Sequence, residues 1–140
     1  MLGWIARSMI RRSVRSLNAG DSGPLLSSCA DDVHFTIRGD HSWAADVHGK
    51  AELATWLQRF IDTKIHFTAR EIVVGGWPWR MTFAIHFSDE ARDDGGEVVY
   101  ANEGVVLGTI AWGKIKTYAV YEDTQKVAAF DEYLAAHPRG

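Results

Sequence analysis

The stretch Val98–Asp123, VVYANEGVVLGTIAWGKIKTYAVYED, predicts two long strands joined by a tight turn at Trp112 and Gly113. Glycine at the second position of a two-residue turn permits the positive φ angle that such a hairpin needs. With this turn, Ala111 lies opposite Lys114. The register of the whole hairpin then follows by counting back along both strands, because side chains alternate between the two faces.

One face of this predicted hairpin is mostly apolar and ends in two carboxylates. The register places Glu103 opposite Glu122 at the end farthest from the turn. Like charges that face each other destabilise a sheet, so the pair is either solvated at an edge or kept for a chemical purpose. The apolar residues predicted to share this face are Val105, Leu107, Tyr118 and Val120.

The composition is that of a soluble globular protein. The 140 residues are 46% hydrophobic and 24% charged, which predicts a single domain over residues 1–140. No apolar run approaches the roughly 18 residues of a membrane span, and the net charge of −3 gives no overall attraction to nucleic acid. We therefore expect a cytoplasmic protein with no membrane or nucleic-acid partner. Cys29 is the only cysteine, which excludes an intrachain disulfide.

The first 20 residues contain four arginines and no acid. This composition is shared by transit peptides and by basic helices that lie on membranes. The alternative, which we favour, is a surface helix with Arg7, Arg11 and Arg15 on its solvated side. The buried stripe would then be Ile10, Val14 and Leu17. Gly20 follows as a helix-ending residue.

The order of predicted elements indicates an α+β domain. Helices are expected at 2–17, 24–29, 50–64 and 125–136, and strands at 33–37, 65–74, 79–88 and in the hairpin. The helix at 50–64 has the clearest period, with apolar residues at 53, 56, 57, 60 and 61. We expect its Trp56 and Phe60 to point toward an antiparallel sheet that has helices on one face.

Four short motifs within this order carry a family resemblance. They are SLNAGD at 16–21, CADDV at 29–33, HGK at 48–50 and WGKIKTYAVYED at 112–123. The chain resembles the nuclear transport factor 2-like superfamily. Within it, the chain is similar to the small bacterial SnoaL-like proteins grouped with polyketide cyclases, ketosteroid isomerases and limonene epoxide hydrolases. The resemblance implies a cone-shaped, curved antiparallel sheet wrapped around N-terminal helices (a cystatin-like α+β barrel), with a deep apolar pocket.

The resemblance also implies a homodimer formed through the convex face of the sheet. In the predicted register, Thr117, Ala119 and Tyr121 point outward. These side chains are small or amphipathic and uncharged, as an obligate contact prefers. The register places Gly104, Val106 and Gly108 beside them.

The well-defined active sites of this superfamily are not matched. Ser13 stands where ketosteroid isomerases carry a tyrosine in the first helix, and Ile37 stands where they carry the proton-shuttling aspartate. Val120 stands where limonene epoxide hydrolases carry their catalytic aspartate. The chain thus lacks an acid or base that each of these two enzyme classes requires. We therefore expect neither ketosteroid isomerase nor limonene epoxide hydrolase activity in its usual form.

The candidate catalytic residues are therefore Glu103 and Glu122. Two carboxylates in a partly dry pocket cannot both ionise cheaply, so one pKa rises toward neutrality and suits general acid–base work. The alternative is that both lie at a solvated rim. Asp123 is expected to cap the last helix. The candidate ligand-binding residues are Ser13, Phe35, Ile37, Trp56, Phe60, Val105, Leu107, Tyr118 and Val120.

No metal site and no cofactor are expected. His34, His41 and His48 are seven residues apart, which is too far for a local metal motif, and no glycine-rich loop precedes a helix. Three functions stay open. The protein is an enzyme that moves a proton on an apolar small molecule, a binding protein for such a molecule, or a dimerisation module whose pocket is filled by side chains.

Overall fold

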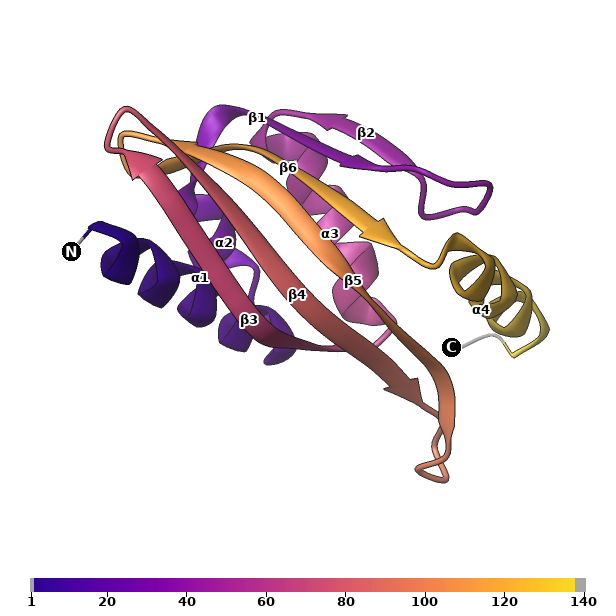
Figure 1. The fold of residues 1–140 in the computed structure, drawn as a ribbon. Coiled ribbons are helices and arrows are strands. Elements are labelled where there is room, and N and C mark those ends of the chain that lie inside the picture. Colours follow the sequence, from indigo (N-terminus) through magenta and orange to yellow (C-terminus); the bar gives the residue numbers. More distant parts are fainter. Residues whose placement is uncertain (1, 138–140) are drawn as a thin grey trace.

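The computed structural model describes residues 2–137 of the chain (Figure 1). The helices are α1 (Leu2–Asn18), α2 (Gly23–Ser28), α3 (Lys50–Asp62) and α4 (Thr124–Ala136). The strands are β1 (Cys29–Ile37), β2 (Ala45–His48), β3 (His66–Trp77), β4 (Arg80–Arg92), β5 (Val98–Ala111) and β6 (Lys114–Glu122).

Within the described residues, the strands form one curved six-stranded sheet in the order β2-β1-β6-β5-β4-β3. Figure 1 shows α1, α2 and α3 on one side of this sheet and α4 beyond the end of β6. The predicted α+β class, with a curved sheet around N-terminal helices, is confirmed. Neighbouring strands are antiparallel except β1 and β6, which run parallel.

The N-terminal helix is part of the fold. Helix α1 packs against β3 and α2, and its buried side chains are Ala6, Ile10 and Ser13. These buried residues form a stripe along the helix that is rotated slightly from the predicted stripe of Ile10, Val14 and Leu17. Val14 and Leu17 are half-buried beside it. Among the described residues, no helix is long and apolar enough to cross a membrane.

Helix α3 buries the side that its period predicts. Leu53 and Leu57 are almost fully buried. The ring of Trp56 meets the ring of Phe35 on β1 with 4.7 Å between centroids and stacks on Phe60 at 5.7 Å. The predicted direction of Trp56, toward the sheet, is confirmed.

Two segments are settled by strand pairing. Residues 39–49 allow a loop or an irregular hairpin from the sequence, and the structure has the hairpin: strand β2 pairs with β1, with Phe35 opposite Val47. Strand β3, expected to end at residue 74, continues through Gly75 and Gly76 as far as Trp77. Its extension comes from pairing with a neighbouring strand, which a single segment does not reveal.

The turn of the last hairpin is the predicted one, but the register beyond it is wrong. Trp112 and Gly113 have φ angles of +52° and +80°, and Ala111 lies opposite Lys114. Ile110 pairs with Ile115, whereas Thr109 pairs with Thr117. Lys116 is therefore an extra residue in β6, a β-bulge that shifts every later pair by one.

The bulge changes which residues of β5 face the interior. Tyr118 lies opposite Gly108, Val120 opposite Val106, and Glu122 opposite Gly104. The predicted partners on β5, Leu107, Val105 and Glu103, are exposed on the outer face. A strictly alternating strand could not turn both Ile115 and Tyr118 inward, because they are three residues apart. The extra residue allows both to do so.

Gly108 lies in this register where a side chain has no room. A Cβ atom there would lie 2.4 Å from the Thr117 carbonyl oxygen and 2.5 Å from the Phe83 ring. We predict that Gly108→Ala lowers the free energy of unfolding by about 1–3 kcal/mol, as overpacking typically does. Urea denaturation measures this change.

Gly75→Ala is the matched control, because a Cβ at this strand position meets nothing within 4 Å. It should leave stability unchanged or raise it slightly. Equal effects of the two substitutions would contradict the observed register.

Candidate functional site

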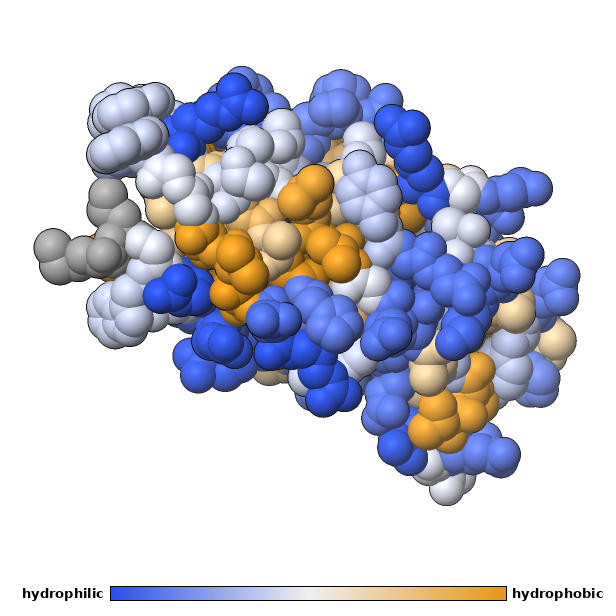
Figure 2. Space-filling model, viewed as in Figure 1, coloured by the Kyte–Doolittle hydropathy of each residue, from blue (hydrophilic) through white to orange (hydrophobic). Residues whose placement is uncertain are grey.

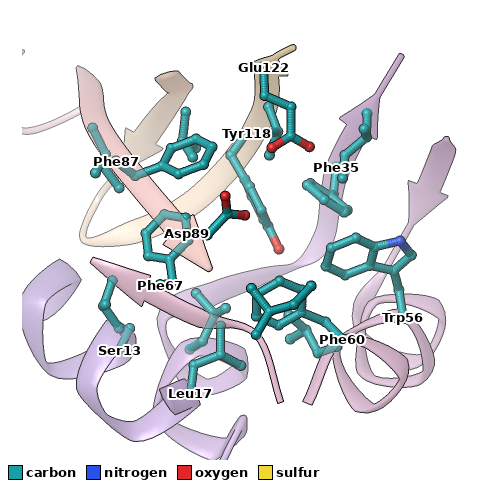
Figure 3. A pocket seen from close by; sticks show the side chains of 18 of the residues that line it. Ser13, Leu17, Phe35, Trp56, Phe60, Phe67, Phe87, Asp89, Tyr118 and Glu122 are labelled. Atoms are coloured by element: carbon teal, nitrogen blue, oxygen red, sulfur yellow. The ribbon is translucent and has the colours of Figure 1, made fainter. Parts of the chain in front are cut away.

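A cavity of about 140 Å³ lies between the inner face of the sheet and the helices (Figure 3). This is close to the size of an apolar protein cavity that holds benzene, and far larger than the space one water needs. Its lining is almost entirely apolar and rich in aromatic rings. The rings include Phe35, Trp56, Phe60, Phe67, Phe87 and Tyr118.

Most, but not all, of the candidate residues named from the sequence line this cavity. Those that do are Ser13, Phe35, Ile37, Trp56, Phe60, Tyr118, Val120 and Glu122. Glu103, Val105 and Leu107 do not, because the bulge in β6 leaves them on the outer face of the sheet. The side chain of Glu103 is 75% exposed and lies 3.5 Å from the His86 ring. The predicted pairing of Glu103 with Glu122 is therefore wrong.

The second carboxylate of the cavity is Asp89 on β4. Its side chain is buried and lines the cavity. Burial raises its pKa to about 7, because desolvation penalises the charged form. The alternation of apolar residues along β4 from Met81 to Phe87 also places Asp89 inward. That alternation was a usable signal in the sequence, but the predicted strand ended at Ser88, one residue before Asp89, whereas β4 continues to Arg92.

Glu122 on β6 faces the same cavity as Asp89. Burial, and to a lesser degree the negative charge of Asp89, together raise its pKa to about 8. Both side chains project into the cavity in Figure 3. Strand β5 separates β4 from β6. Its Gly104 lies opposite Glu122 and carries no side chain, whereas the buried Asn102 lies opposite Asp89. The two acids therefore come from strands on either side of β5 and line the same cavity.

The hydroxyl of Tyr118 lies in the same cavity and has no hydrogen-bond partner among the described residues. Burial, and to a lesser degree the nearby Cys29, raise the pKa of Tyr118 well above its usual value. The hydroxyl therefore stays protonated and can donate a hydrogen bond. Asp89 Oδ1 and the indole nitrogens of Trp43 and Trp56 are also buried without a partner in the described part of the chain. Such atoms are rare in folded proteins, so polar atoms of a ligand are the expected partners.

Other polar residues near the cavity already have partners. The hydroxyl of Ser13 donates to the Met9 carbonyl at 3.0 Å within α1. Asn102 Nδ2 donates to the Tyr100 hydroxyl at 3.1 Å and to the Asp123 carbonyl at 3.0 Å. These bonds hold the end of β6 beside the cavity.

Asp123 caps α4, as its position predicts. One carboxylate oxygen accepts the backbone N–H of Gln125 at 3.0 Å. Its role is thus structural, although it follows Glu122 directly. Cys29 offers no nucleophile near neutral pH, because burial raises the pKa of its thiol to about 11.

Metal-binding potential lies away from the cavity. In residues 2–137, His34, Asp46 and His48 are the only group of three or more histidine, cysteine or acidic side chains close enough to share an ion. They sit on β1 and β2, and none of them lines the cavity.

The SnoaL-like domain family model matches residues 10–118, and no curated protein matches the sequence significantly. Among solved structures, a nuclear transport factor 2-like protein from Burkholderia xenovorans has 18% identity and a TM-score of 0.68, over 92% of this chain and 97% of that one.

Two further structures share the fold with a TM-score of 0.68. A Δ5-3-ketosteroid isomerase from Mycobacterium sp. has 21% identity over 86% of this chain and 95% of its own. TerC, co-crystallised with polyporic acid, has 17% identity over 93% of this chain and 98% of its own. These matches confirm the resemblance to the nuclear transport factor 2-like superfamily, and the protein belongs to its SnoaL-like domain family.

Proposed function

We propose that this protein is a cofactor-independent enzyme that moves a proton on a small, mostly apolar molecule bound in the cavity. The observation that carries the proposal is the presence of Asp89 and Glu122, both with raised pKa, in one apolar cavity. A catalytic acid or base works best when its pKa lies near the pH of its surroundings.

The two carboxyl groups share a proton in the proposed mechanism. Burial raises both pKa values toward neutrality, to about 7 for Asp89 and about 8 for Glu122, and the two groups titrate as a coupled pair. With one proton on the pair, we assign Asp89 as the base and the protonated Glu122 as the acid.

The unpartnered hydroxyl of Tyr118 favours a ligand with a carbonyl oxygen. In the proposed reaction, the Asp89 carboxylate takes a proton from the carbon beside the carbonyl. The electron pair moves to the oxygen, which accepts a hydrogen bond from Tyr118. Glu122 delivers its proton to another carbon of the resulting enolate. Asp89 ends protonated and Glu122 ionised, and one proton passing back between them restores the pair.

The size of the cavity limits the ligand class. A volume of about 140 Å³ suits a single ring, by comparison with cavities that hold benzene. A larger ligand requires side chains such as Trp56 and Phe60 to move. The solved neighbours include a ketosteroid isomerase and a protein crystallised with polyporic acid. They support a small-molecule function for a protein of this fold.

The second candidate function is a protein that binds an apolar molecule and catalyses no reaction on it. The almost wholly apolar lining supports it, because only a few polar atoms face the cavity. Mass spectrometry of a ligand carried through purification would identify the bound compound in either case. The dimerisation module with a filled pocket is disfavoured by the size of the cavity.

We also propose that the protein is a homodimer joined through the outer face of the sheet. Figure 2 shows an apolar area over the middle of this face, bordered by hydrophilic residues. Val73, Val105, Leu107 and Tyr121 are exposed there, each by more than a third. Val105 and Leu107 replace Gly104, Val106 and Gly108 of the predicted contact, which the bulge turns inward. An apolar patch of this kind commonly marks an interface.

The proton-transfer proposal is testable before the substrate is known. In 5-nitrobenzisoxazole, a base removes the proton on C3 while the N–O bond breaks, which releases a coloured phenolate. We expect the protein to accelerate this reaction over the same concentration of acetate. Asp89→Asn, alone or with Glu122→Gln, should lower the rate by roughly 100-fold or more.

The control for this measurement is Glu103→Gln, which removes a carboxylate from the outer face and should leave the rate unchanged. Quenching of tryptophan fluorescence shows whether the probe binds. A probe that binds without acceleration, or a rate that survives the double substitution, would overturn the catalytic proposal and favour the binding protein.

The raised pKa values predict how stability depends on pH. Each carboxyl group holds its proton more tightly when folded than when unfolded, where its pKa is about 4. Its stabilising effect is complete below pH 4 and is lost as the pH rises to about 7 for Asp89 and 8 for Glu122. Glu122→Gln should therefore flatten the fall in unfolding free energy between about pH 4 and pH 8. Urea denaturation at several pH values measures the slope, and Glu103→Gln should keep the wild-type slope.

The dimer proposal predicts that Leu107→Asp produces monomers. A carboxylate on the exposed apolar patch would have to be desolvated in the interface, which is costly. Sedimentation at micromolar concentration should show a dimer for the wild type. It should also show a dimer for Thr55→Asp, which places the same charge on the exposed side of α3. A monomeric wild type would contradict the proposal.

A further inference from the structure

Strand pairing brings together two histidines that are 14 residues apart in the sequence. His34 on β1 lies directly opposite His48 on β2 in the antiparallel register. Their rings stack with 4.3 Å between centroids and 14° between planes. Asp46 precedes His48 by two residues, so it projects from the same face of β2. Local spacing therefore missed a cluster that only the pairing of β1 with β2 creates.

This cluster lies on the opposite side of the sheet from the cavity. The neighbouring pair, Phe35 and Val47, is buried under the sheet. Because side chains alternate along a strand, His34 and His48 point outward. Their side chains are 41% and 65% exposed, and that of Asp46 is 69% exposed. An ion can reach all three without entering the fold.

The donor atoms of the three side chains converge. Asp46 Oδ1 lies 2.5 Å from His34 Nε2 and 3.3 Å from His48 Nε2. One donor atom from each residue lies within 4.8 Å of the others. A tetrahedral Zn²⁺ ion with bonds of about 2.0–2.2 Å holds its donors roughly 3.3–3.5 Å apart. The His48–Asp46 spacing already fits, and the His34–Asp46 spacing needs to widen by less than about 1 Å.

We propose that His34, Asp46 and His48 form a surface site for a divalent transition metal of the Zn²⁺ type. Two imidazole nitrogens and one carboxylate oxygen are ligands that Zn²⁺, Co²⁺ and Ni²⁺ accept, whereas Mg²⁺ and Ca²⁺ prefer sets of oxygens. Water completes the coordination, because the site faces solvent. A bound ion would link the edge strand β2 to β1. The backbone at His48 is already fixed, because its N–H donates a hydrogen bond to the Glu52 carboxylate at 3.0 Å.

A simpler role for these residues is protection of the sheet edge. Strand β2 is the last strand of the sheet, and edge strands commonly carry charged side chains that discourage pairing with other chains. The His34–Asp46 hydrogen bond would serve this role alone. It does not explain why a second imidazole nitrogen also lies 3.3 Å from the same carboxylate oxygen. The two roles differ in whether the cluster binds one metal ion.

Titration calorimetry with ZnCl₂ on the tag-free full chain tests the site. We expect one Zn²⁺ per chain, and we expect His34→Gln and His48→Gln each to weaken binding by roughly tenfold or more, as loss of a ligand does. His66→Gln is the matched control, because His66 is an exposed histidine on β3 and should leave the affinity unchanged. Mg²⁺ should not compete.

Two further readouts exclude an effect of misfolding. Zinc should raise the melting temperature of the wild type and of His66→Gln, but not that of the double variant of His34 and His48, whose circular dichroism should match the wild type. In proton NMR, Co²⁺ should shift the ring signals of His34 and His48 first. Absence of stoichiometric binding, or binding that survives the double substitution, would overturn the proposal and leave edge protection as the role of the cluster.

Discussion

The extra residue in β6 is the constraint on which the cavity depends. Near the turn, Ile115 must face inward to close the core, and three residues later Tyr118 must also face inward to reach the cavity. Lys116 makes both possible by leaving the ladder, and its ammonium group reaches Asp32 at 2.5 Å on the outside. A regular strand in the same place would turn Glu122 outward, because a slip of one residue exchanges the two faces. The position of an ionisable group in the cavity thus follows from a single bulge.

The sequence was sufficient for the class of fold, the turn and the main helices, and insufficient for the faces of the last hairpin. The turn depends on Gly113, and the period of α3 is unambiguous. In β5, however, residues 105–107 are all apolar, so alternation does not say which side is inside. The outer face is apolar as well, which removes the usual contrast. Gly104 and Gly108 carried the missing information, because the backbone of strand β6 approaches β5 closely at both positions and leaves no room for a side chain.

Asp89 was missed for a different reason. The segment after Phe87 reads SDEARDD, and such a polar run indicates the end of a strand. The strand instead continues to Arg92, paired with β5 to its end and with β3 as far as Glu90. A buried aspartate contradicts the ordinary preference of carboxylates for the surface. Conflicts between local preference and the overall fold are expected at functional sites, so this residue marks the site more clearly than any of the apolar residues that surround it.

The cost of burying Asp89 and Glu122 favours a functional explanation for both. Near neutral pH each carboxyl group either keeps a proton that water would remove or holds a charge in an apolar space, and both options destabilise the fold. Apolar side chains of similar size would fill the same cavity without this cost. The stacked aromatic pairs of the lining, such as Phe67 with Phe87, provide stability that offsets it. A fold optimised for stability alone would not place two acids in one cavity, whereas an acid–base enzyme needs a pair of carboxyl groups that share a proton near neutral pH.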